Sequence, residues 1–272
     1  MLFQRAITAL LLLPIGIGAI VVGGPVFFII AAIVILLASA EFLQLFLKDQ
    51  NRLVYAFTLF SVLAILLARW NRAFELDPIL LPLIIIGAMF LHLNKFENGN
   101  DRAASEFAFS LSAIIYVGLL GAFAISIRDL EMGQWWLLII FGATWIADMG
   151  AYFVGRSIGN HKMLPALSPL KSWEGYLGGI ALSILLIPSY VGALAYLGMP
   201  EAPIFNTTNI LVIALILSVV APLGDFGISM IKRQFKAKHT SNLLREHGGM
   251  LDRLDSILWA MPIGYLLIDL LT

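Results

Sequence analysis

Four aspartates lie at the edges of long apolar stretches of this chain. Asp148 and Asp225 fall near the ends of two such stretches, and Asp252 and Asp255 open a third. Asp252 and Asp255 are three positions apart, so on a helix they share one face. A single acid in such a place commonly pairs with a nearby Lys or Arg, but acids within a membrane are costly and mark functional sites by default. Four acids at similar depth beside basic segments favour a reactive site.

The polar segment 229–255 adds cations and glycines to these acids. Clustered Lys and Arg side chains suit phosphate oxygens, and adjacent glycines before a helix let backbone N–H groups approach an anion. Carboxylates beside phosphates suit Mg²⁺, so this pattern predicts phosphate chemistry assisted by a divalent cation. Attraction to lipid headgroups would explain the cations, but not the acids and glycines among them. The residues concerned are Lys232, Arg233, Lys236, Lys238, His247, Gly248, Gly249, Asp252 and Asp255.

The elements that must position these residues are membrane helices. Hydrophobic residues make up 60% of the 272 positions and charged residues 12%, whereas a soluble domain carries about 25% charged residues. A segment in lipid must satisfy its own backbone hydrogen bonds, so the sequence predicts an all-α, polytopic membrane protein of about nine transmembrane helices. We expect these helices near residues 6–22, 25–47, 53–69, 78–93, 107–127, 134–154, 174–197, 208–231 and 254–271.

The distribution of positive charge predicts the orientation. All but three of the 17 Lys and Arg residues fall on one side of this arrangement, the exceptions being Arg69, Arg72 and Arg128. Cytoplasmic loops carry the excess of Lys and Arg, so we expect the N-terminus in the cytoplasm and the C-terminus outside. We also expect residues 1–130 to form a scaffold with dimer contacts and residues 131–272 to carry the active site.

Two longer motifs occupy the C-terminal half of the chain. One runs Asp148-x3-Tyr152-x2-Gly155-Arg156 and continues to Ser168-Pro169-x-Lys171-x-Trp173-Glu174-Gly175. The other runs Ser229-x2-Lys232-Arg233, then Lys238, then His247-Gly248-Gly249-x2-Asp252-Arg253-x-Asp255. Together they resemble the signature of the phosphatidate cytidylyltransferases, also called CDP-diacylglycerol synthases. The chain departs from that signature at His239, where the family usually has Asp, and at Arg245-Glu246, where it usually has Pro-Gly.

The resemblance implies a fold of many membrane helices, a homodimer, and dependence on a divalent metal, Mg²⁺, with a second cation as an option. It implies that CTP and phosphatidic acid are joined to give CDP-diacylglycerol and pyrophosphate for phospholipid biosynthesis. The expected partners are therefore CTP, phosphatidic acid, membrane lipid and a second copy of the chain, and no nucleic acid. The expected location is the bacterial cytoplasmic (inner) membrane, with the active site facing the cytoplasm.

The resemblance also suggests roles for single residues. We expect Asp225 and Asp252 to hold Mg²⁺. The residues expected to act in catalysis, by holding phosphate oxygens or assisting at the metal, are Lys171, Ser229, Lys232, Arg233 and Asp255. The residues expected to bind substrate are Asp148, Tyr152, Arg156, Ser168, Lys238, His247, Gly248, Gly249 and Arg253. Glu41 is expected to be structural, near Lys48 at the inner end of its helix.

Two other functions stay open at this point. Pro222, Gly224 and Gly227 around Asp225 suggest a broken helix that lines a cavity, and broken helices with membrane acids suit a secondary transporter. A transporter places its site near the midplane, however, whereas the acids here lie at one face. A related polyprenol or phytol kinase would also use a nucleotide and a metal on a lipid. An assay can distinguish the three functions: only the synthase transfers label from CTP into lipid in a reaction that depends on phosphatidic acid.

Overall fold

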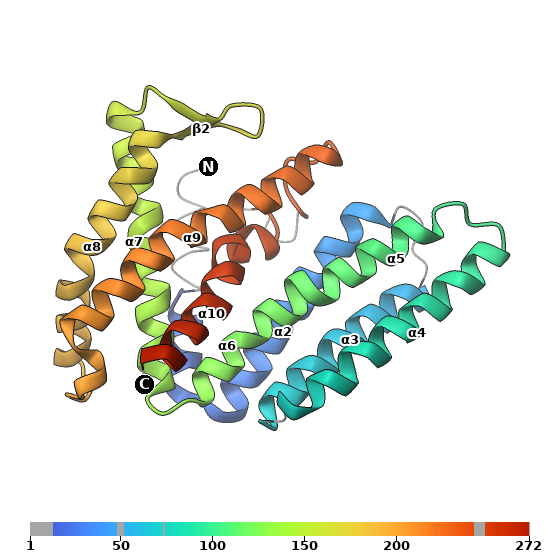
Figure 1. The fold of residues 1–272 in the computed structure, drawn as a ribbon, viewed down its shortest axis with the longest axis horizontal. Helices are drawn as coiled ribbons and strands as arrows, with labels where there is room; N and C mark the ends of the chain where they lie inside the picture. Colours follow the sequence, from blue (N-terminus) through green and yellow to red (C-terminus); the bar gives the residue numbers. More distant parts are fainter. Residues whose placement is uncertain (1–12, 48–51, 73, 242–247, 272) are drawn as a thin grey trace. The chain divides into compact units, whose positions relative to one another are not determined.

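The computed structural model describes residues 13–47, 52–72, 74–241 and 248–271. Most of these residues lie in helices, so the all-α prediction is confirmed (Figure 1). The long helices are α2 (Gly24–Phe46), α3 (Arg52–Trp70), α4 (Asp77–Glu97), α5 (Ala103–Ser112), α6 (Leu120–Asp129), α7 (Gly133–Ile158), α8 (Trp173–Tyr196), α9 (Thr207–Gln234) and α10 (Leu251–Leu271). The shorter elements are the helix Leu13–Val22, the turns η1 (Phe74–Leu76) and η3 (Pro203–Phe205), the π-helix η2 (Ala113–Leu119), and the strands β1 (Lys162–Leu164) and β2 (Ser168–Ser172).

Eight helices within the described ranges are long and apolar enough to cross a membrane, so the chain is a polytopic membrane protein. One of the eight, Ala103–Asp129, combines α5, η2 and α6 without a break. The expected span 6–22 begins outside the described residues, and its described part is the helix Leu13–Val22. Each of the other expected spans overlaps an observed helix.

The chain divides into two compact units. The first comprises Met1–Asp129 and Phe235–Leu254, and the second comprises Leu130–Gln234 and Asp255–Thr272. The segment 235–254 therefore clusters with the N-terminal helices, although it lies in the C-terminal half of the sequence. The roles expected of residues 1–130 and 131–272 stay predictions.

In the first unit, α2 and α3 pack against each other and against η2. Gly118 of η2 permits this approach, because a Cβ there would lie 2.8 Å from Val62 Cγ2. Phe46 at the end of α2 stacks on Phe109 of α5, and Phe235 meets the ring of Phe46 edge-on with centroids 4.3 Å apart. The polar segment that follows α9 is thereby anchored to the N-terminal helices.

In the second unit, α7 packs along α8, and α9 packs against both helices (Figure 1). A Cβ at Gly179 of α8 would lie 2.6 Å from the carbonyl oxygen of Ala147 on α7. A Cβ at Gly224 of α9 would lie 2.2 Å from the carbonyl oxygen of Asp255 on α10. Both glycines allow backbone-to-backbone packing, and Gly224 brings the helix of Asp225 against the backbone of Asp255.

Helix α9 is continuous where the sequence suggested a break. It runs from Thr207 to Gln234 with Pro222 buried inside it. Proline removes one backbone hydrogen bond, and membrane helices tolerate that loss where neighbouring helices pack against them. Gly224 serves the contact with α10. The broken-helix interpretation is therefore wrong, and the transporter hypothesis loses one of the two features that favoured it, the other being the acids within the membrane.

A buried arginine joins several elements of the first unit. Arg69, at the end of α3, is only 2% exposed, and its Nη2 donates to Asp77 Oδ2 at 2.5 Å. Its guanidinium also lies over the rings of Phe74 and Phe123, at 4.0 and 5.6 Å from their centroids. No hydrogen-bond partner is seen for its Nε and Nη1 within the described part of the chain. Asp77 is therefore the counter-ion on which this buried charge depends.

The Asp77→Asn substitution should markedly destabilise the first unit. It leaves a buried guanidinium without its counter-ion, which typically costs about 3–5 kcal/mol. Asp129→Asn is the matched control, because Asp129 pairs with Arg72, whose side chain is 74% exposed, and exposed ion pairs contribute little. Thermal unfolding of the detergent-solubilised protein should show a large fall in midpoint for Asp77→Asn and almost none for Asp129→Asn. Equal shifts would contradict this account of Arg69.

Candidate active site

An ion pair joins β2 to α9 in the second unit. Lys171 Nζ of β2 lies 2.6 Å from Asp225 Oδ2 of α9, and each side chain is about one-third exposed. Ser229, one helical turn further along α9, donates its hydroxyl to Asp225 Oδ1 at 3.2 Å. The Lys171 ammonium also lies 4.2 Å from the centre of the Phe226 ring. Both oxygens of Asp225 therefore have partners, and Lys171 is held by charge and by an aromatic face.

Two further carboxylates gather around this pair. Asp148 of α7 and Asp255 of α10 interact electrostatically with Asp225 and with each other. Lys171 interacts with Asp148, and Lys232 interacts with Asp225 and Asp255. Charges that are partly withdrawn from water act on one another more than charges in bulk solvent do. The structure thus brings together six of the residues expected in the site, namely Asp148, Lys171, Asp225, Ser229, Lys232 and Asp255.

A β-hairpin carries Lys171 to this cluster. β1 pairs antiparallel with β2, with Lys162 opposite Ser172 and Leu164 opposite Ser168 (Figure 1). Ser172 then caps α8, because its Oγ accepts the N–H of Gly175 at 3.2 Å. The expected polar loop is therefore an ordered hairpin between α7 and α8. Ser168 is a strand residue of it, and its predicted role in substrate binding is untested.

The other motif residues of the second unit form a row beyond Asp148. Tyr152 and Arg156 follow Asp148 at intervals of four along α7, and Arg156 Nη1 donates to the Tyr152 hydroxyl at 2.8 Å. Both side chains are exposed, as is Arg233 at the end of α9. An exposed guanidinium beside an exposed hydroxyl suits an anionic ligand. Their roles in substrate binding and catalysis stay predictions.

Asp252 belongs to the first unit and has a different environment. Its side chain is 9% exposed. Its Oδ2 accepts hydrogen bonds from Thr240 N at 2.9 Å, Thr240 Oγ1 at 3.0 Å and Gly249 N at 3.0 Å. His239 is the position that departs from the family signature, and its Nδ1 lies 4.0 Å from Asp252 Oδ2. Asp252 thus organises the turn that leads into α10.

Backbone N–H groups at the start of α10 also donate to Glu41, which the sequence suggested to be structural and near Lys48, a residue outside the described ranges. Met250 N and Leu251 N donate to Glu41 of α2 at 2.9 and 2.8 Å. The N–H groups of 249–251 therefore bind carboxylates, whereas the sequence suggested that this helix start would bind phosphate. Lys238 and Arg253 are exposed near this turn, and His247 lies outside the described residues.

The donor set of the second unit suits a magnesium ion. Mg²⁺ commonly takes one or two protein carboxylates and completes its octahedron with water and substrate phosphates. Asp225, with Asp148 and Asp255 near it, offers such carboxylates, although no three acidic or histidine side chains in the described ranges form a ready-made metal cage. Asp225 and Asp252 fall in different units. Metal binding by either residue stays a prediction.

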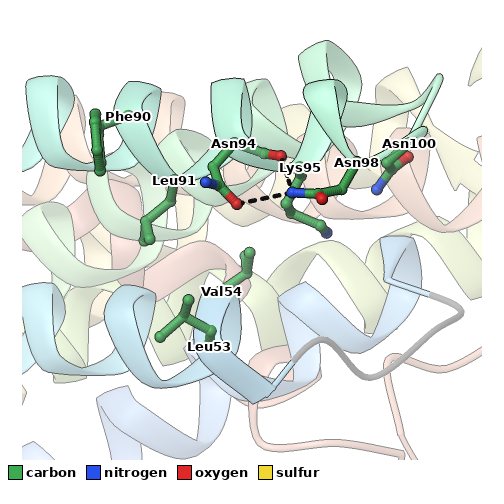
Figure 2. Close-up of a pocket in the computed structure, with 8 residues that line it drawn as sticks. All are labelled: Leu53, Val54, Phe90, Leu91, Asn94, Lys95, Asn98 and Asn100. Atoms are coloured by element: carbon green, nitrogen blue, oxygen red, sulfur yellow. Dashed lines mark hydrogen bonds between the residues drawn. The ribbon is translucent and has the colours of Figure 1, made fainter.

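A pocket of about 530 Å³ opens elsewhere, between α3 and α4 of the first unit (Figure 2). Its apolar wall is formed by Leu53, Val54, Phe90 and Leu91, and its polar wall by Asn94, Lys95, Asn98 and Asn100. Asn98 Nδ2 donates to the backbone oxygen of Asn94 at 2.7 Å and to its Oδ1 at 3.0 Å. No lining residue belongs to either sequence motif, so the carboxylate cluster is the candidate active site.

Comparison with known proteins shows the family of the chain. Residues 3–271 match the cytidylyltransferase family. A phosphatidate cytidylyltransferase of Bacillus subtilis is 40% identical over 174 residues, which cover 63% of this chain and 61% of that protein. Two others align over 95% of this chain and 96% of their own length at 30% identity, one from Staphylococcus epidermidis over 267 residues and one from Staphylococcus aureus over 264. The chain, with its carboxylate and lysine cluster, belongs to the cytidylyltransferase family.

Proposed function

We propose that this chain transfers CMP from CTP to phosphatidic acid, which gives CDP-diacylglycerol and pyrophosphate. The observation that carries the proposal is the cluster in which Lys171 and Lys232 meet three carboxylates from three membrane helices. Family membership and relatives named phosphatidate cytidylyltransferase support the same reaction. The membrane helices agree with a substrate that is itself a lipid.

The reaction requires charge neutralisation more than it requires a base. A phosphate monoester has a second pKa of about 6, so phosphatidic acid is largely dianionic near pH 7 and already nucleophilic. One of its oxygens forms a bond to the α-phosphorus of CTP, the bond from that phosphorus to the bridging oxygen breaks, and pyrophosphate leaves with that electron pair. The obstacle is repulsion between the two anions as they approach.

The residues of the second unit can relieve that repulsion. Lys171 and Lys232 supply ammonium groups beside the carboxylates, and each can hold phosphate oxygens. A divalent cation such as Mg²⁺, when bound, would neutralise charge on the triphosphate and on the leaving pyrophosphate. Asp225, with Asp148 and Asp255 beside it, would hold that cation. Ser229 keeps the Asp225 carboxylate in position through its hydroxyl.

The site faces the cytoplasm in this proposal, where CTP is available. The end of α7 with Arg156, the hairpin with Lys162 and Lys171, and the end of α9 with Lys232 are all basic, as expected for cytoplasmic segments. The proposed location is the bacterial cytoplasmic (inner) membrane, and the bacterial origin of the relatives supports it. The proposal also includes a homodimer, which is supported only by the resemblance to the family.

Replacing Lys171 by Met should reduce turnover by on the order of a hundredfold to a thousandfold, as expected when one donor to developing charge is lost. The measurement is transfer of label from CTP into organic-extractable lipid by purified protein, phosphatidic acid and Mg²⁺. Lys162→Met is the control, because Lys162 is an exposed lysine on the other strand of the same hairpin, and it should keep wild-type activity. If Lys171→Met is as active as Lys162→Met, Lys171 has no part in the reaction. If the wild type places no label in lipid, the synthase proposal fails.

Single cysteines can test the orientation, because the chain contains none of its own. Cysteine at Ser157, at the end of α7, and at Gln234, at the end of α9, should be protected from an impermeant thiol reagent added to intact cells. Cysteine at Glu201, in the connection between α8 and α9, should react. All three side chains are exposed in the structure. The reaction with the thiol reagent therefore depends only on which side of the membrane each residue faces. The reverse pattern would invert the topology.

A further inference from the structure

A carboxylate from α2 holds the segment that carries the glycine-rich motif. Glu41 is 4% exposed. Its Oε1 accepts hydrogen bonds from Ser241 Oγ at 2.6 Å and Met250 N at 2.9 Å. Its Oε2 accepts hydrogen bonds from Thr240 Oγ1 at 3.1 Å and Leu251 N at 2.8 Å. Each oxygen thus receives one hydroxyl and one backbone amide, which is how a buried carboxylate is stabilised.

The Glu41 carboxylate is linked to that of Asp252. The Thr240 hydroxyl lies between them, 3.1 Å from Glu41 Oε2 and 3.0 Å from Asp252 Oδ2. A hydroxyl has one hydrogen to donate, so it can serve only one of the two acceptors at a time. Gly249 N donates to Asp252, and Met250 N and Leu251 N donate to Glu41. The two acids together occupy the donors at the start of α10.

The adjacent glycines leave room for these acids. A Cβ at Gly249 would lie 2.2 Å from both Glu41 Oε2 and Thr240 Oγ1. Gly248 has φ +77°, and a Cβ there would lie 2.5 Å from Asp252 Oδ2. Any larger residue at either position would displace a carboxylate. The Gly-Gly pair is therefore explained by close packing against Glu41 and Asp252.

Glu41 projects from a rigid part of α2. Phe42 and Leu43, which follow it, are 1% and 0% exposed. Tyr55 of α3 donates its hydroxyl to the carbonyl oxygen of Ala40 at 3.0 Å, next to Glu41. Phe42 also lies against Tyr116 of η2. A fixed carboxylate on a buried helix can hold an otherwise irregular segment in one conformation.

We infer that Glu41 is a positioning residue for the cytidylyltransferase reaction. It acts through residues 240, 241 and 248–252, whose conformation sets where Asp252 and its neighbour Arg253 are presented. Glu41 itself touches no substrate in this assignment, since its four contacts are all to protein donors. The inference rests on the proposed function, because it assigns to that reaction a residue of the N-terminal helices.

The test is Glu41→Gln, which is close in shape but turns an accepting oxygen into a donating NH₂ group. That group cannot accept from the hydroxyl and amide that now bind there. We expect kcat to fall by about tenfold to a hundredfold, as misplacement of a catalytic segment does, while the KM for phosphatidic acid changes little. Glu106→Gln is the matched control: Glu106 is another largely buried carboxylate of the first unit, paired with Lys95, and it should leave kcat unchanged.

Hydrogen–deuterium exchange without CTP or metal gives a second readout. The amides of Met250 and Leu251 should exchange faster in Glu41→Gln than in wild type or Glu106→Gln, because their acceptor is altered. Ser241→Ala removes one of the four hydrogen bonds and should show the same change more weakly if Glu41→Gln fails to fold. Unchanged exchange, or faster exchange with wild-type kcat, would overturn the positioning role. An inactive wild type would overturn the proposed function instead.

Discussion

Charge placed in or beside a membrane span must be neutralised locally, and the pairing of Lys171 with Asp225 is the interaction on which the site depends. Asp225 lies inside a long apolar helix, where an unpaired carboxylate would be costly. The lysine comes from a hairpin outside the helices, so the hairpin must fold for the charge to be balanced. Folding of the hairpin and stability of the carboxylate cluster therefore depend on each other.

Aspartate side chains are short, so three of them can interact only if their helices approach closely. Helix α7 packs against α9, and Gly224 lets α9 lie against the backbone of α10. Two acids of the first unit are satisfied in another way. Glu41 and Asp252 receive hydrogen bonds from hydroxyls and backbone amides, and Glu41 has no cation among the partners described for it. The second unit therefore places cations beside its acids, whereas Glu41 and Asp252 of the first unit hold the residues at the start of α10.

Much of the fold and part of the carboxylate cluster could be predicted from the sequence, because a segment in lipid must be apolar and must satisfy its own backbone hydrogen bonds. Long apolar runs predicted the helices. Four acids at similar depth predicted a cluster, and three of them, Asp148, Asp225 and Asp255, interact in the second unit. The fourth, Asp252, belongs to the first unit, where it accepts hydrogen bonds from Thr240 and Gly249. The hairpin could not be predicted, since β1 has only three residues and a proline stands in β2. Pro222 suggested a break that neighbouring helices make unnecessary. The role of Glu41 had no local signal, because its partners lie about two hundred positions away.

Divalent-cation binding at Asp225 tests most directly whether the cluster of the second unit is built for phosphate chemistry. Mn²⁺ can be titrated into the purified protein and the free ion followed by electron paramagnetic resonance, with no substrate present. Wild type should bind Mn²⁺, and Asp225→Asn should weaken binding by about tenfold or more, the scale on which changes at metal sites act. Asp269→Asn, near the far end of α10, should bind as wild type does. Equal Mn²⁺ affinity in wild type and Asp225→Asn would contradict the assignment of the cluster as a metal site.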